Sequence, residues 1–99
     1  MIVVSGRFRL PLERIADARP YMAKVIAASS AEPGCRVYSY AEAIDEPGLF
    51  RVYEEWDGQA ALEAHFTSSH MREWQAAREA LGFHDRSIVA YEIENPLCL

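Results

Sequence analysis

Two histidines, His65 and His70, are the side chains of this chain best suited to acid–base chemistry. An imidazole titrates near neutral pH, so it can take a proton from a phenol. Leu62, His65 and Phe66 fall within one sector of a helix, which predicts that His65 points toward the apolar interior. We therefore expect His65 to be a catalytic base, with His70 at the rim of its site. The alternatives are a hydrogen-bonded core residue for His65 and a helix start for His70.

Aromatic side chains are dense around these histidines. We expect Tyr53, Trp56 and Trp74 to line a flat cavity, together with His70, and to bind a small aromatic molecule there. The alternative is that these rings fill the core and a subunit interface, where aromatic side chains contribute most of the buried area.

Two adjacent acids, Glu54 and Glu55, precede Trp56. Side chains alternate between the two faces of a strand, so these carboxylates do not form a catalytic pair. Glu54 shares a face with Phe50 and Trp56, and we expect it to form a salt bridge with an arginine across the sheet or across a subunit interface.

Signals for a metal or an organic cofactor are absent from the sequence. His65 and His70 are five residues apart, whereas two ligands on one helix face are typically four apart. There is no glycine-rich phosphate loop and no serine or cysteine nucleophile motif. Cys35 follows a turn at a strand start, which is typical of a packed thiol. We therefore expect a protein that needs no cofactor.

The elements that must position these residues can be predicted from periodicity and turn chemistry. Apolar side chains at helical spacing follow a β-rich start, and Pro20 predicts a kink or a break in that helix. Asp57 and Ser69 are the expected N-caps of two later helices, and Gly82 ends the second. We expect strands at residues 1–10, 35–43, 49–56 and 87–94, and helices at 12–30, 58–66 and 69–81.

This order predicts one α+β domain over residues 1–99 with a ferredoxin-like, split βαβ arrangement. A four-stranded antiparallel sheet would carry the helices on one face. Large apolar groups stand on both faces of the strand at 49–56, so the uncovered face is expected to pack against a second copy of the chain.

Bulk properties exclude several classes of protein. A net charge of −5, with a single lysine and nine scattered arginines, argues against nucleic-acid binding. No apolar run approaches the roughly 20 residues that span a bilayer. The first residues lack the basic start and apolar core of a signal peptide, and two cysteines do not form a disulfide framework. We expect a cytoplasmic protein with reduced thiols.

Three segments carry a resemblance to a known family: Pro33-Gly34-Cys35, Tyr53-Glu54-Glu55-Trp56, and the stretch from His65 to His70. A hairpin followed at once by two histidines and two tryptophans resembles the antibiotic biosynthesis monooxygenase family, which includes quinol monooxygenases. The resemblance implies a ferredoxin-like homodimer, called a dimeric α+β barrel, with a hydrophobic pocket between sheet and helices. It also implies oxidation of a small aromatic or quinol substrate by O2 without metal, flavin or nicotinamide.

Related branches of this fold offer alternatives. The haem-degrading branch uses an Asn on the first strand and a Trp and a His on the helical segment. Here the first strand has no Asn, and His65 and Gln75 stand where the Trp and His would be, which disfavours haem degradation. A non-catalytic, stress-associated dimer that binds a small molecule is the main alternative. An isomerase or dehydratase is a more distant one.

Overall fold

The computed structural model describes residues 1–99, and its strands and helices follow one another in the expected order. The sequence first forms a strand, a short 3-10 turn and a long helix, then a hairpin, two short helices and a last strand. The bounds are β1 Ile2–Arg9, the 3-10 turn Leu12–Arg14, α1 Ile15–Ser30, β2 Cys35–Glu42, β3 Leu49–Trp56, α2 Gln59–Phe66, α3 Ser69–Ala80 and β4 His84–Glu92.

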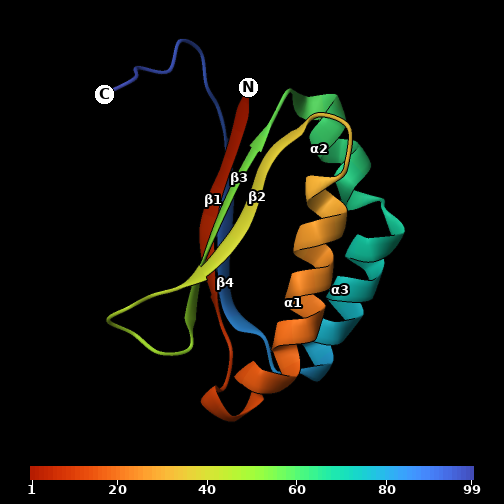
Figure 1. Ribbon diagram of the computed structural model, residues 1–99, viewed down its shortest axis with the longest axis vertical. Coiled ribbons are helices and arrows are strands. Elements are labelled where there is room, and N and C mark those ends of the chain that lie inside the picture. The colour runs from red at the N-terminus through yellow and green to blue at the C-terminus, as the bar shows by residue number, and fades with distance from the viewer.

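The four strands form one antiparallel sheet in the order β2-β3-β1-β4. All three helices lie on the same face of this sheet, and the C-terminal tail leads away from it (Figure 1). The prediction of an α+β, ferredoxin-like fold is therefore confirmed. The hairpin between β2 and β3 closes at Gly48, whose φ of +86° suits a residue without a side chain.

Alternation along each strand decides which side chains meet the helices. On β3, Phe50, Val52, Glu54 and Trp56 are buried under the helices, whereas Arg51 and Tyr53 are exposed on the other face. The helices contribute residues at helical spacing, namely Ala18, Met22, Val25 and Ser29 from α1, Leu62 and His65 from α2, and Met71 and Trp74 from α3. The hydrophobic core is thus a single layer between the helices and the inner face of the sheet.

Several local expectations were wrong by a residue or more. α1 continues through Pro20 without the break that was one of the two expected outcomes, and a 3-10 turn precedes it. Gly58 is the N-cap of α2, and the Asp57 side chain forms an ion pair with Arg36 at 2.6 Å. Ser68, not Ser69, caps α3, and its Oγ accepts a hydrogen bond from the backbone of Met71.

The outer face of the sheet is uncovered in the single chain. Tyr53, Val89 and Tyr91 are exposed there, and β4 begins at His84, three residues before its expected start. Of the large outer-face side chains of β3, Leu49 at the strand end is buried in the single chain, whereas Tyr53 is exposed. The longest helix has 16 residues, and none of the helices combines the length and the apolar character of a membrane span.

Candidate functional site

A cavity of about 130 Å³ lies between the inner face of the sheet and helices α2 and α3. Its apolar wall includes Phe8 from β1, Trp74 from α3, and Phe83 from the turn before β4. The polar side chains that line it come from strands β2, β3 and β4 and from helices α2 and α3. They are Tyr38, Tyr40, Glu54, His65, Arg78 and Arg86. An aromatic wall with a few converging polar groups is typical of a small-molecule site.

His65 is the histidine of this cavity. It lies on α2, is 1% exposed, and packs against the rings of Trp56 and Tyr38 with centroid distances of 4.8 and 5.2 Å. Its Nδ1 is 3.0 Å from Oε1 of Glu32. With the carboxylate ionised, Nδ1 carries the proton and Nε2 keeps the lone pair that can accept one. Burial lowers the pKa of His65, and the Glu32 carboxylate opposes that effect, so the imidazole is neutral at neutral pH.

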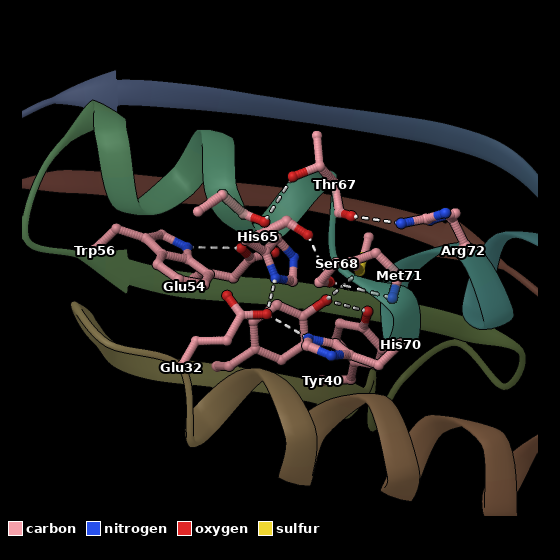
Figure 2. Close-up of polar contacts among 12 residues, drawn as sticks. Glu32, Tyr40, Glu54, Trp56, His65, Thr67, Ser68, His70, Met71 and Arg72 are labelled. Carbon is pink, nitrogen blue, oxygen red and sulfur yellow. Dashed lines mark hydrogen bonds and ion pairs between the residues drawn. The ribbon is translucent and has the colours of Figure 1, made fainter.

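Glu32 holds a second imidazole with the same oxygen. Nε2 of His70 also contacts Oε1 of Glu32, so the carboxylate lies between the two rings (Figure 2). Glu32 follows α1, and His70 stands in the first turn of α3, so three separate segments meet here. His70 lies outside the cavity, in a small hollow with Tyr21 and Lys24.

Glu32, His65 and His70 together form a cluster of side chains that could hold a metal ion. Their ligand atoms lie within 4.8 Å of one another, and two imidazoles with one carboxylate suit Zn²⁺ or another transition ion. The spacing of the two histidines did not predict this cluster, because the third member, Glu32, is 33 residues before His65.

Glu54 is the buried acid of the cavity. It is 6% exposed, and its Oε1 accepts a hydrogen bond of 2.9 Å from Nε1 of Trp56. Burial raises the pKa of Glu54 to about 7, although the Trp56 hydrogen bond and the charge of Arg86 oppose the shift. The salt bridge expected across the sheet does not form, since no arginine of the same chain lies within 4.0 Å of this carboxylate. A salt bridge across a subunit interface stays a prediction.

Two tyrosines on β2 complete the polar wall. The hydroxyls of Tyr38 and Tyr40 are 2.8 Å apart and hydrogen-bonded to each other. Burial raises the pKa of both, that of Tyr40 to about 12, so both remain neutral phenols at neutral pH. Neutral hydroxyls at this position can donate a hydrogen bond to an oxygen of a bound ligand.

The structure brings together only some of the predicted site residues. His65 and Trp74 line the cavity. Trp56 does not line it but is fully buried behind it, where its ring packs on His65 and its N–H bonds Glu54. His70 reaches the site only through Glu32. Tyr53 lies on the outer face of the sheet, where its hydroxyl donates to Glu55, because alternation along β3 turns it away from the helices.

Sequence reasoning missed Glu32, Arg78 and Arg86 as site residues and assigned Glu54 to a salt bridge. For Glu54 there was a signal, since an acid stands among Phe50, Val52 and Trp56 on one strand face. Glu32 and the two arginines carried no such signal, because only the packing of α1, α3 and β4 brings them to the site.

Comparisons with known proteins agree with this architecture. A family model described as antibiotic biosynthesis monooxygenase matches residues 1–77. A crystal structure of a candidate antibiotic biosynthesis monooxygenase from Deinococcus radiodurans is 26% identical, with a TM-score of 0.94 and coverage of 100% of this chain and 98% of that one. Rv0793 from Mycobacterium tuberculosis shares the fold at 23% identity, with a TM-score of 0.86 over 98% of each chain.

A curated sequence relative is the uncharacterised protein sll1783 of Synechocystis. It is 32% identical over 73 residues, which cover 74% of this chain. The chain spans about half (50%) of the length of this relative.

Proposed function

The chain belongs to the antibiotic biosynthesis monooxygenase family, and we propose that it is a cofactor-independent monooxygenase that oxidises a small aromatic or quinol substrate with O2. The observation that carries this proposal is His65, a buried imidazole in the wall of an aromatic cavity with its Nδ1 bound to Glu32. That bond leaves Nε2 as the ring nitrogen available to a substrate.

The proposed first step is removal of a phenolic proton. Nε2 of His65 takes the proton, and the imidazolium that forms is stabilised by the Glu32 carboxylate on its other side. The resulting phenolate is electron-rich and reduces O2 directly, so the substrate supplies the electrons that a flavin or a metal would otherwise provide. For a quinol, one oxygen atom enters the ring to give a hydroxyquinone and the other leaves as water.

The remaining residues support this chemistry in distinct ways. Glu54, with a pKa of about 7, can hold a proton and deliver it to reduced oxygen, and the Trp56 hydrogen bond fixes its carboxylate. Trp74, Phe8 and Phe83 exclude water and give a ring-shaped substrate flat surfaces to pack on. His70 shares the counter-ion of His65 and is proposed to tune that base rather than to touch the substrate.

The proposal includes a homodimer that packs through the outer face of the sheet. Tyr53, Val89 and Tyr91 form an exposed apolar patch there, and the register places Tyr53 and Val89 on either side of Ser5. Leu97 and Leu99 of the tail are also exposed, and a second copy would bury them. Both cysteines are free, which supports the cytoplasmic location expected from the sequence.

Oxygen consumption tests the proposed activity. Purified protein is mixed with reduced quinones, and O2 uptake above the spontaneous rate is followed with the product identified by mass spectrometry. We expect protein-dependent uptake and a product one oxygen atom heavier than the parent quinone. Binding of the same compounds without turnover would overturn the monooxygenase proposal and favour a small-molecule-binding module.

A further inference from the structure

Two arginines in the cavity wall have no acidic partner. Arg78 on α3 and Arg86 on β4 both line the cavity, and neither forms an ion pair. Four other arginines, Arg7, Arg9, Arg14 and Arg36, do pair with acids. Arg19, Arg51 and Arg72 are also unpaired, but they are exposed and do not line the cavity, whereas Arg78 is the one unpaired arginine that is half-buried.

Burial makes the unpaired state of Arg78 costly. Its side chain is half-buried, and its guanidinium lies 5.4 Å from the centre of the Phe83 ring. Burial and the nearby charge of Arg86 both lower the pKa of Arg78, so the two guanidiniums repel each other. A guanidinium in water needs no partner, but one that faces a cavity with a second cation is stabilised by an anion that enters it.

The other groups that face the cavity do not supply that anion. An imidazole is never an anion near neutral pH, so His65 on α2 supplies no negative charge, and Tyr38 and Tyr40 on β2 keep their protons. Glu54 on β3 is the one carboxyl in the wall, and its hydrogen bond goes to Trp56 rather than to either arginine. The cavity therefore carries a net positive charge.

We propose that the ligand of this cavity is a single-ring aromatic acid, with its carboxylate held by Arg78 and Arg86 and its ring against Trp74 and Phe83. The proposal rests on the proposed function and names the substrate class of the same site. A guanidinium presents two parallel N–H groups that match the two oxygens of a carboxylate, so Arg binds this group bidentately.

Size and layout support one ring. A cavity of about 150 Å³ in another protein accepts benzene, and the one here is about 130 Å³. Arg78 is seven residues after Met71 on α3, which is about 10 Å along the helix axis. Met71 contacts Tyr38, which packs on His65. The carboxylate would thus bind at one end of the cavity, with a phenolic hydroxyl directed to His65 at the other.

The test compares a ligand pair that differs only in charge, 4-hydroxybenzoate and 4-hydroxybenzamide. Binding is measured by calorimetry and by fluorescence of Trp74, which lines the cavity, so no turnover is needed. We expect the acid to bind about ten- to a hundredfold more tightly than the amide. The R78Q/R86Q double variant should lose this preference and bind the amide as the original chain does.

A matched control removes the same charge elsewhere. Arg19 and Arg51 are exposed, do not line the cavity and form no ion pair, so R19Q/R51Q should keep the preference for the acid. If R78Q/R86Q does not fold, the single R86Q variant on the exposed edge strand β4 should show a partial loss of the preference.

Four results would overturn the proposal: no binding of 4-hydroxybenzoate at millimolar concentration, equal affinity for acid and amide, a preference that survives R78Q/R86Q, or an equal loss in R19Q/R51Q. A change of oligomeric state in R78Q/R86Q with unchanged ligand preference would also overturn it, because an acid of a second copy would then be the partner. Acid preference without oxygen uptake would refute the proposed activity but leave this ligand class standing.

Discussion

Glu32 Oε1 lies 3.0 Å from Nδ1 of His65, although 33 residues separate the two in the chain. This contact decides which nitrogen of the buried imidazole carries the proton in its neutral form. A histidine whose Nδ1 is occupied by a carboxylate presents Nε2 as its base, with a counter-ion ready for the charge that it acquires.

Removal of the imidazole separates a catalytic from a structural role of His65. If His65 is the base, His65→Ala should lower turnover by roughly 10²–10⁴-fold. If it is only a core residue, the variant should instead lose roughly 1–3 kcal/mol of stability, because Glu32 loses a partner, with turnover per folded molecule unchanged. Oxygen uptake and thermal unfolding on the same sample distinguish the two. His84→Ala, at an exposed position on β4, is the matched control.

Substitution of the carboxylate tests the orientation of His65. Glu32→Gln can donate an amide N–H to Nδ1 and so favour the tautomer with its proton on Nε2. We expect turnover to fall at least about tenfold, with ¹⁵N NMR showing the change of tautomer. Glu73→Gln, which alters the exposed pair with Lys24, should change neither quantity. An unaltered tautomer in Glu32→Gln would contradict the assigned role.

Stability should depend on pH through Glu54. Its pKa is about 7 when folded against 4.5 for an ordinary glutamate, so the folded chain binds more protons between these values. The free energy of unfolding therefore falls as pH rises through this window, by roughly 3 kcal/mol in full. Glu54→Gln, which keeps an acceptor for Trp56, should unfold at a higher temperature than the original chain at pH 8. The difference should shrink toward pH 5, and a gap independent of pH would count against the raised pKa.

Metal removal should leave the activity unchanged. The cluster of Glu32, His65 and His70 has the donor set of a transition-metal site, yet the proposed chemistry uses His65 as a free base. Dialysis against a strong chelator should therefore not reduce turnover, whereas added Zn²⁺ should inhibit by occupying the imidazole. Loss of activity on chelation, restored by one metal, would refute the cofactor-free prediction.

Assembly should depend on the outer face of the sheet. Val89→Arg places a charge in the exposed patch with Tyr53 and Tyr91, and we expect it to convert a dimer into a monomer in light scattering. Ile44→Arg, on the fully exposed loop between β2 and β3, is the control and should remain dimeric. A monomeric original chain at micromolar concentration would refute the dimer itself.

Element type and order could be predicted from the sequence because they depend on local periodicity. The spacing of Leu62, His65 and Phe66 placed His65 on the buried face of α2, and the turn at Gly48 defined the hairpin. Alternation on β3 already separated Tyr53 from Trp56, so both could not line a cavity covered by one helical layer. The helix N-caps were displaced by one residue, since Ser68 rather than its neighbour Ser69 accepts the backbone hydrogen bond of α3, and α2 begins after Gly58 with no side-chain cap.

The partners of the candidate base were decided by tertiary structure alone. The turn after α1 brings Glu32 against α2 and α3, and β4 brings Arg86 to the cavity wall. These contacts join segments far apart in the chain, and no local pattern encodes them. Burial then sets the protonation of both groups, because removal of water raises the pKa of Glu54 and lowers the pKa of His65. Each shift favours the neutral form of the side chain. Periodicity specifies which face of an element is buried, whereas the identity of the group across from it depends on how the elements pack.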